Sequence, residues 1–315
     1  MKANTNNCKV CQNEKDNKSF IAKEMMFGTR DEFEYMECSK CGCVQIIEIP
    51  EQLAKYYPDN YYSFKPTKKG LAGSIDLYVK KQVALSRIGK STIGGILMPL
   101  NKRYLRWLNN QCKVDFDSKV LDVGCGGGKL LKEMSHFGFK DLTGVDPFIA
   151  KDISYKPNIQ IFKKELSDVD SKYDLIMLHH SFEHMIDPSQ VFNQLSKLIS
   201  DKGRIVIRIP VADSKAYENY GANWVELDAP RHTFLHTKKS VEILANEVGL
   251  RVVDTIYDSS KFEIVGSEKF VRDIPSIENQ QLFSKEELKN FEKVVEDYNE
   301  NGTAGRACFY LEKAS

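Results

Sequence analysis

The sequence predicts an α/β protein whose mainly parallel sheet carries helices on both faces, preceded by a small cysteine-rich module. From Lys119 onward, apolar strand-like segments alternate with segments of helical spacing, which is the pattern of a doubly wound sheet. Five of the eight cysteines lie between Cys8 and Cys43, among polar residues with little helical periodicity. The 315 residues, 42% of them hydrophobic, suffice for one large domain and an attached module.

The overall charge argues against some classes of partner. Forty-five lysines and arginines face 44 aspartates and glutamates, which gives a formal net charge of +1. Such a chain has no global field for holding a polyanion by counterion release, so we expect no nucleic-acid partner. The N-terminal residues lack the apolar core of a signal peptide, and no apolar run is long enough to span a membrane. We therefore expect a cytoplasmic protein, whose oligomeric state the sequence leaves open.

Residues 1–50 are predicted to form the small module, with strand-like segments at 33–38 and 44–49. Two Cys-x-x-Cys turns each present two thiolates to one point, and two such pairs suit tetrahedral zinc. The expected ligands are Cys8, Cys11, Cys38 and Cys41. Four sulfur ligands leave no open coordination position, so we expect a structural metal. Cys43 stays open as a ligand in place of Cys41.

Residues 51–114 are predicted to connect this module to the core. A tyrosine-rich stretch, 56–64, precedes a region of mainly helical spacing that the sequence IGKSTIGG interrupts. Tyr61 and Tyr62 are expected either to cover a bound ligand or to pack the module onto the core. The third expected unit spans 115–315.

The core elements follow from periodicity. Strands are predicted at 119–123, 142–146, 158–162, 173–180, 204–210, 250–258 and 306–313. Helices are expected to begin at Lys129, at Pro188 and near Lys239, with a last helix within 284–302. Asp187 and Pro188 form a good N-cap and first-turn pair.

A glycine-rich loop follows the first core strand. Gly124, Gly126 and Gly128 lie between a strand and a helix, where a backbone without β-carbons can turn sharply and approach a ligand. The dinucleotide fingerprint needs its third glycine at the position of Lys129, which weakens the case for a nicotinamide cofactor.

Two carboxylates lie close to this loop. Asp146 ends the second strand, where a carboxylate can accept the two hydroxyls of a ribose, and Asp122 precedes the first glycine by two residues. Two acids at one sheet edge repel a pyrophosphate and attract the ammonium and sulfonium of S-adenosylmethionine. The sequence therefore favours S-adenosylmethionine as the ligand.

Four motifs, VLDVGCGGG, GVDP, YDLIMLHHSFEHMIDP and KGRIVIRIP, resemble in their order and spacing the class I S-adenosylmethionine-dependent methyltransferases. The resemblance covers residues 115–315 and implies a Rossmann-like, seven-stranded sheet. It places Gly124, Gly126 and the backbone of Cys125 around the methionine part, Asp122 near its amino group and Asp146 on the ribose. For the acid that meets adenine it leaves Glu165 or Asp168. The implied cofactor residues are Asp122, Gly124, Cys125, Gly126, Gly128, Asp146, Pro147, Glu165 and His179, with Tyr61 from the connector.

Five of the six histidines gather in two segments, HHSFEH and PRHTFLH, both expected at the carboxyl edge of the sheet. Moving a methyl group to a hydroxyl requires a group that takes the proton, and histidine suits that role near neutral pH. The resemblance implies a catalytic Glu183–His184 pair, although this pair can instead only orient its loop. His232 is expected to bind the acceptor, in a long loop with polar and stacking groups. The secondary candidates are His180 and His236, and the other acceptor-binding candidates are Trp224, Asp228 and Arg231.

Together with the N-terminal module, the chain resembles methyltransferases of sugar modification, although it lacks the longer C-terminal domain of the sugar C-methyltransferases. The resemblance implies methylation of a sugar, a sugar nucleotide or a polysaccharide precursor, and we expect oxygen as the acceptor atom. Carbon and a phosphorylated or phosphoramidate sugar substituent remain alternatives. A non-catalytic protein that senses S-adenosylmethionine is the alternative of another class, and the intact glycine loop argues against it.

Overall fold

The computed structural model describes residues 7–57, 74–97 and 105–314. Tyr61 and Tyr62 lie outside the described residues. Among the described helices, none combines the length and the apolar character that crossing a membrane requires.

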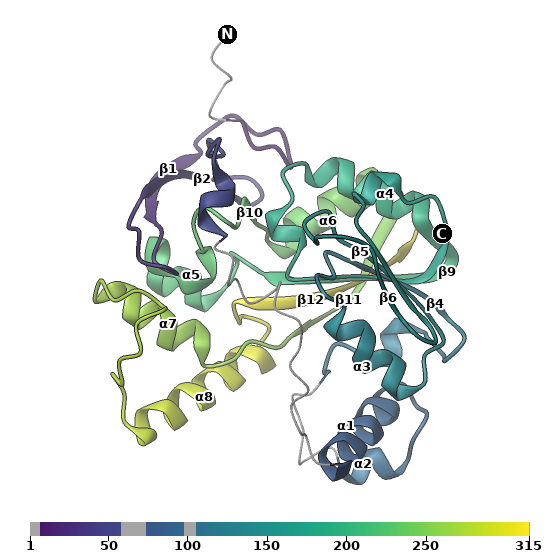
Figure 1. Ribbon diagram of the computed structural model, residues 1–315. Coiled ribbons are helices and arrows are strands. Elements are labelled where there is room, and N and C mark those ends of the chain that lie inside the picture. The colour runs from purple at the N-terminus through teal and green to yellow at the C-terminus, as the bar shows by residue number, and fades with distance from the viewer. Residues whose placement is uncertain (1–6, 58–73, 98–104, 315) are drawn as a thin grey trace.

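A twisted sheet of eight strands forms the centre of the described structure (Figure 1). In spatial order the strands are β11 (Leu250–Tyr257), β12 (Arg306–Lys313), β9 (Ile199–Pro210), β8 (Tyr173–His179), β4 (Lys119–Val123), β5 (Asp141–Val145), β7 (Ile159–Phe162) and β6 (Ile153–Tyr155). The five strands from β9 to β7 are parallel, whereas β12 runs antiparallel to both of its neighbours. The mainly parallel α/β sheet is therefore confirmed.

The expected number of seven strands is wrong by one. The additional strand is β6, which has three residues and pairs antiparallel with the edge strand β7. A segment this short contains too few residues for an alternating pattern to stand out in the sequence.

Helices cover both faces of the sheet (Figure 1). On one face α4 (Pro188–Leu198) and α6 (Lys238–Glu247) bury Leu195 and Leu244 in a core that also contains Ile207 of β9. On the other face α3 (Lys129–Phe137) and α1 (Ser74–Arg87) close a second core, which buries Leu131 and Ile88. The remaining helices are α2 (Ile93–Leu97), α5 (Lys215–Tyr220), α7 (Phe262–Val271) and α8 (Lys285–Glu300).

Local signals explain where two helices begin. The Asp187 carboxylate accepts the N–H of Gln190 at 2.9 Å, and Pro188 occupies the first turn of α4, as its sequence predicts. Ser284 and Glu287 form a reciprocal capping box at the start of α8.

The cysteine-rich segment forms a second, four-stranded antiparallel sheet. Its order is β1 (Lys18–Lys23), β2 (Glu32–Glu37), β3 (Val44–Ile46) and β10 (Phe234–Leu235). Strand β10 belongs to the long loop between β9 and α6 and pairs with β3 through Phe234 opposite Gln45 and Leu235 opposite Val44. A strand from the core segment of the chain thus completes the N-terminal sheet.

Candidate active site

The glycine-rich loop joins β4 to α3 at the carboxyl edge of the large sheet. Gly124, Gly126 and Gly128 have φ values of 73°, 51° and 73°, a region that favours glycine. A β-carbon on Gly124 would lie 2.5 Å from Cβ of Ser181, and one on Gly128 would lie 2.3 Å from Cδ1 of Ile161. A side chain would therefore be strained at both positions because of the positive φ, and at Gly124 it would also clash with Ser181.

Two buried carboxylates lie beneath this loop. Asp146 accepts the N–H of Gly126 through Oδ2 and the N–H of Phe148 through Oδ1, both at 2.8 Å. Burial, and then the charge of Asp146, raises the pKa of Asp122 to about 8. A site with two closely spaced acids is a better environment for a cationic ligand than for a pyrophosphate.

The remaining expected cofactor residues lie around the same edge with less distinctive contacts. Cys125 packs so closely on β5 that a β-carbon on Gly144 would lie 2.5 Å from its sulfur, and Pro147 follows Asp146 directly. The Nε2 atom of His179 is buried with no hydrogen-bond partner among the described residues, and its ring centroid is 4.4 Å from that of Trp107. Glu165 and Asp168 are both exposed, and neither carboxylate is fixed by a side-chain cap.

The two histidine segments meet beside the glycine loop. Glu183 and His184 lie in a short 3-10 helix, Phe182–His184, after β8, and His232 lies in the loop that leads to β10. The ring centroids of His184 and His232 are 4.8 Å apart. Ligand-type atoms of Glu183, His184 and His232 all lie within 4.8 Å of one another, and these three residues are hereafter the EHH cluster. Side chains 48 positions apart in the chain thus form one polar group.

Backbone carbonyls orient both histidines of the EHH cluster. Nδ1 of His184 is 2.9 Å from the carbonyl oxygen of Arg231, and Nδ1 of His232 is 2.7 Å from that of Glu226. A carbonyl only accepts hydrogen bonds, so each Nδ1 carries the proton and each Nε2 keeps a free lone pair. Burial, and then the neighbouring His232, lowers the pKa of His184 to about 4, so this imidazole is neutral at pH 7.

Glu183 is buried without a hydrogen bond. Its side chain is 0% exposed, and neither carboxylate oxygen has a hydrogen-bond partner among the described residues. Burial raises the pKa of Glu183 to about 8. Nδ1 of His180 is 3.4 Å from Oε1 of Glu183, while Nε2 of His180 accepts an N–H of Arg208 at 2.8 Å. His180 therefore lies between Glu183 and Arg208, and its catalytic role stays a prediction.

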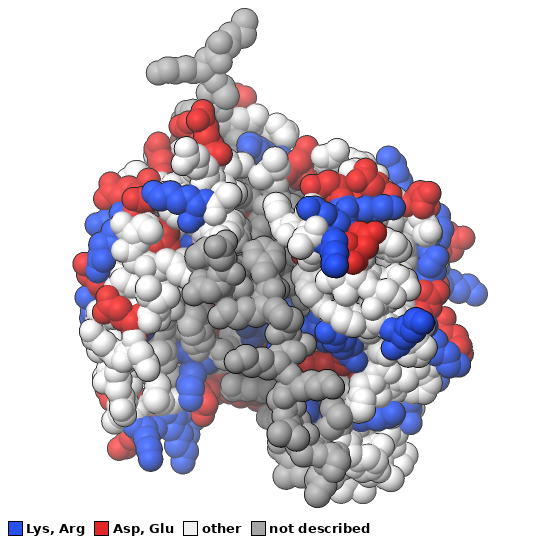
Figure 2. Space-filling model, viewed as in Figure 1, with Lys and Arg blue, Asp and Glu red and all other residues white. Residues whose placement is uncertain are grey.

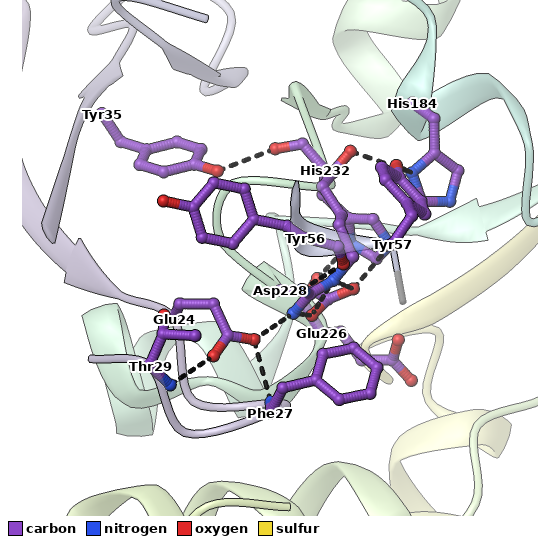
Figure 3. Close-up of polar contacts among 11 residues, drawn as sticks. Glu24, Phe27, Thr29, Tyr35, Tyr56, Tyr57, His184, Glu226, Asp228 and His232 are labelled. Atoms are coloured by element: carbon purple, nitrogen blue, oxygen red, sulfur yellow. Dashed lines mark hydrogen bonds and ion pairs between the residues drawn. The ribbon is translucent and has the colours of Figure 1, made fainter. Parts of the chain in front are cut away.

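The segment between β9 and β10 was expected to bind the acceptor, and Figure 3 shows the polar contacts that several of its residues make. The Arg231 side chain is 0% exposed and donates hydrogen bonds to Asp228, to Glu24 and to the carbonyl of Tyr56. Trp224 is also fully buried. The expectation that Trp224 and Arg231 bind the acceptor is therefore wrong, because both side chains are fully buried and the guanidinium holds the loop to the module. The expected role of Asp228, whose Oδ2 lies 3.8 Å from Nε2 of His232, stays a prediction.

Two further contacts concern the histidines. Tyr57, which the sequence did not single out, has its hydroxyl 3.2 Å from Nδ1 of His184, so the start of the tyrosine-rich connector contacts the EHH cluster. His236 is buried between the rings of Phe182 and Phe234, at centroid distances of 4.5 and 5.7 Å, and serves packing.

The four expected metal ligands converge. Sγ of Cys8 is 3.6 Å from that of Cys41, Sγ of Cys11 is 3.5 Å from that of Cys38, and all four sulfurs lie within 4.8 Å of one another. Zn–S bonds of about 2.3 Å in a tetrahedron separate the sulfurs by about 3.8 Å, so the group fits zinc. Cys43 is not in this group: its sulfur lies near the carbonyl of Val44 and Nδ1 of His236.

Comparison with known proteins finds methyltransferases, which agrees with the S-adenosylmethionine site that the glycine loop predicts. A family described as "Methyltransferase domain" matches residues 99–255. The chain is 26% identical over 155 residues to the ubiquinone biosynthesis O-methyltransferase of Aeromonas salmonicida (strain A449), covering 45% of this chain and 65% of that protein. The same enzyme of Proteus mirabilis (strain HI4320) is 27% identical over 129 residues, covering 38% of this chain and 52% of that protein. The chain thus spans between about half and two thirds of the length of these curated relatives.

A further curated relative and a solved structure are also similar to this chain. The malonyl-[acyl-carrier protein] O-methyltransferase 1 of Ilyobacter polytropus is 25% identical over 195 residues, covering 56% of this chain and 72% of that protein. A solved mycolic acid cyclopropane synthase is similar with a TM-score of 0.45 at 15% identity, over 69% of this chain and 85% of that one. These matches therefore support a class I, S-adenosylmethionine-dependent methyltransferase domain in this part of the chain.

Proposed function

We propose that the protein transfers the methyl group of S-adenosylmethionine to an oxygen atom of a small polar acceptor. One observation supports this most strongly: the segment after β8 packs directly on the glycine loop. The Ser181 hydroxyl donates to the carbonyl of Val123 at 2.8 Å, and Gly124 has no room for a β-carbon against Ser181. The EHH cluster begins two residues later, so acceptor chemistry and methyl donor share one edge of the sheet.

On the donor side, S-adenosylmethionine supplies an electrophilic methyl group when it is bound. Gly124 and Gly126 offer backbone to its methionine part, and the buried Asp122 offers a carboxylate to its ammonium. Asp146 is assigned to the ribose. In this assignment its carboxylate holds the loop through Gly126 and receives ribose hydroxyls at the same time, because each carboxylate oxygen accepts more than one hydrogen bond.

On the acceptor side, the hydroxyl must be held in line with the sulfur–methyl bond and must lose its proton. The EHH cluster supplies the groups for this: two Nε2 lone pairs and a carboxylate without a hydrogen bond. Oxygen is favoured over carbon because the matched relatives are named as O-methyltransferases.

We assign the acceptor to the carbohydrate class: a sugar, a sugar nucleotide or a polysaccharide precursor. The whole-chain resemblance described above and the imidazole, carboxylate and phenol groups near His184 support it, since such groups suit a hydroxyl-rich molecule. On the face shown in Figure 2, basic and acidic residues are interspersed, which agrees with an acceptor other than a polyanion. The names of the two relatives above refer to ubiquinone biosynthesis, so ubiquinone precursors belong in the acceptor test.

In this proposal the four-cysteine group holds one structural zinc ion. The ion would fix the turns that precede β1 and follow β2 and would leave the chemistry to the sheet edge.

The test is incubation with labelled S-adenosylmethionine and a panel of nucleotide sugars, glycan precursors and ubiquinone precursors, with mass detection of a methyl increment. Gly124→Ala should abolish transfer, because φ is 73° and Ser181 occupies the space of the new methyl group. Gly127→Ala is the matched control in the same loop, since a β-carbon there meets nothing within 4 Å. Equal transfer by wild type and Gly124→Ala would refute the assignment of the donor site.

A further inference from the structure

We infer that the EHH cluster binds one divalent transition-metal cation, separate from the ion held by the cysteines. Two imidazoles and one carboxylate form the ligand set that proteins use for zinc and for ferrous iron with open coordination positions. One ligand-type atom from each of Glu183, His184 and His232 lies within 4.8 Å of the other two. Small side-chain movements suffice to bring three atoms at this spacing onto one ion.

The histidines carry the outer hydrogen bonds that metal-binding histidines need. A ligating imidazole usually donates its other N–H to a carbonyl or carboxylate, which fixes the ring and leaves the opposite nitrogen for the ion. His184 and His232 both do this through Nδ1, to the carbonyls of Arg231 and Glu226 at 2.9 and 2.7 Å. Nε2 of His232 is 3.8 Å from Oδ2 of Asp228, which is too long for a hydrogen bond, so that lone pair stays available.

The environment of the Glu183 carboxylate is an independent reason to expect a cation at the cluster. Glu183 is 0% exposed, and neither of its oxygens has a hydrogen-bond partner in the described part of the chain. A buried carboxylate without a hydrogen bond is costly, and buried charges are normally paired or bound to metals. The nearest basic group, His180, approaches only one oxygen, at 3.4 Å. A cation at the cluster would satisfy Glu183.

The surrounding charges also favour a cation. The buried guanidinium of Arg231 faces two carboxylates, Glu24 and Asp228. This group of three therefore holds two acidic side chains and one basic one, and the guanidinium of Arg208, which contacts His180, is itself paired with Asp258. Since charges in a poorly hydrated interior interact strongly, the carboxylate of Asp228 would attract a divalent cation at the cluster.

Three protein ligands leave at least one coordination position open. Resting on the proposed function, an acceptor oxygen would occupy this position, where the cation would lower the pKa of the hydroxyl. Because the Nε2 lone pairs then bind the cation, the proton would leave to solvent water, and the methyl group would move from the sulfonium sulfur to the oxygen. The acceptor would then be one that offers a hydroxyl to a metal. Binding of the cation itself does not depend on methyl transfer, so the two proposals can fail separately.

The experiment is equilibrium dialysis of the full-length, zinc-loaded protein against Co²⁺, followed by elemental analysis. Wild type should hold one cobalt ion per chain in addition to its zinc. Glu183→Gln, which keeps the shape but removes the charge, and His184→Ala should lose the cobalt and keep the zinc. His136→Ala is the matched control, because His136 is an exposed histidine at the end of α3 and its loss should leave both ions in place.

Far-UV circular dichroism and retained zinc would show that the variants fold. Wild type that takes up no cobalt beyond its zinc, or folded Glu183→Gln that takes up as much as wild type, would overturn the cation site. Methyl transfer that persists fully in metal-free buffer would overturn its role in the reaction. Failure of every acceptor in the panel, with cobalt binding intact, would instead count against the proposed function.

Discussion

At the scale of single residues, we propose that the carboxylates under the glycine loop hold the methyl donor. Asp146 accepts two backbone N–H groups, one from the loop itself. We predict that Asp146→Ala lowers affinity for S-adenosylmethionine at least about tenfold, since charge-assisted hydrogen bonds contribute about 1.5–3 kcal/mol. Isothermal calorimetry measures this. Asp141→Ala, at the exposed start of the same strand, is the control, and unchanged affinity in Asp146→Ala would remove Asp146 from the site.

Asp122 should make stability depend on pH. Burial raises its pKa from 3.8 to about 8 in the folded protein, so the folded state keeps a proton that the unfolded chain has lost. Its contribution is therefore complete below about pH 4 and decreases as pH rises toward 8, by at most about 1.4 kcal/mol per pH unit. Asp122→Asn cannot titrate. Urea unfolding between pH 5 and 8 should show a smaller decrease in the variant, and parallel curves would contradict the burial of an ionisable Asp122.

Substitutions in the EHH cluster should change turnover or acceptor binding without changing the affinity for S-adenosylmethionine. His184→Ala is expected to lower turnover by about 10²–10⁴-fold, because the acceptor hydroxyl loses a group that acts on it directly or through a bound cation. His232→Ala should mainly raise the KM for the acceptor. Neither change should alter S-adenosylmethionine affinity, and His136→Ala should alter nothing. Two variants with unchanged kinetics would make both histidines structural.

At the scale of elements, one buried ion group holds the loop before β10 against the N-terminal sheet. Arg231 is 2.7 Å from Glu24 of the module and also pairs with Asp228 of its own loop. Arg231→Ala leaves two buried carboxylates without their cation, which should cost about 3–5 kcal/mol in free energy of unfolding. Urea denaturation measures the loss.

The exposed ion pair of Arg30 and Asp273 provides the comparison. It too joins the N-terminal segment to the core, at 3.1 Å, but its side chains are 42% and 68% exposed. Arg30→Ala should therefore change stability by no more than about 1 kcal/mol. Similar losses in Arg30→Ala and Arg231→Ala would mean that burial of the Arg231 group has little energetic weight.

At the scale of the whole molecule, the cysteine group and the EHH cluster are connected through one sheet. Strand β10 pairs with β3, and the Tyr35 hydroxyl of β2 donates to the carbonyl of His232 at 2.9 Å. Cys41→Ser should lose the zinc and speed hydrogen exchange in residues 18–46 and 234–235, while β4 and β8 stay protected. Methyl transfer should fall as well, because His232 loses its support.

Cys43→Ala tests which thiols form the metal site. Its sulfur lies outside the four-cysteine group, so the variant should keep one zinc per chain by elemental analysis. Loss of zinc in Cys43→Ala with retention in Cys41→Ser would reverse the ligand assignment.

The sequence by itself determined the features that depend on neighbouring residues. Alternating apolar segments predicted the parallel sheet, and three closely spaced glycines predicted a sharp turn after β4, where the structure has positive φ values that glycine adopts without strain. The Cys-x-x-Cys spacing predicted a group of four sulfurs, since each turn already brings two of them together. Such signals involve only a few neighbouring residues and can therefore be recognised in the sequence.

Tertiary structure alone decided the contacts between distant segments. Arg231 is a charged residue in a polar segment. Nothing beside it in the sequence reveals that its side chain is buried and pairs with Glu24, 207 positions earlier. The Tyr57 hydroxyl lies beside His184, and β10 completes a sheet that begins at Lys18. The physical reason is that a charged or aromatic side chain is equally acceptable in water and against a complementary partner, so its role is set by which surfaces the fold brings together.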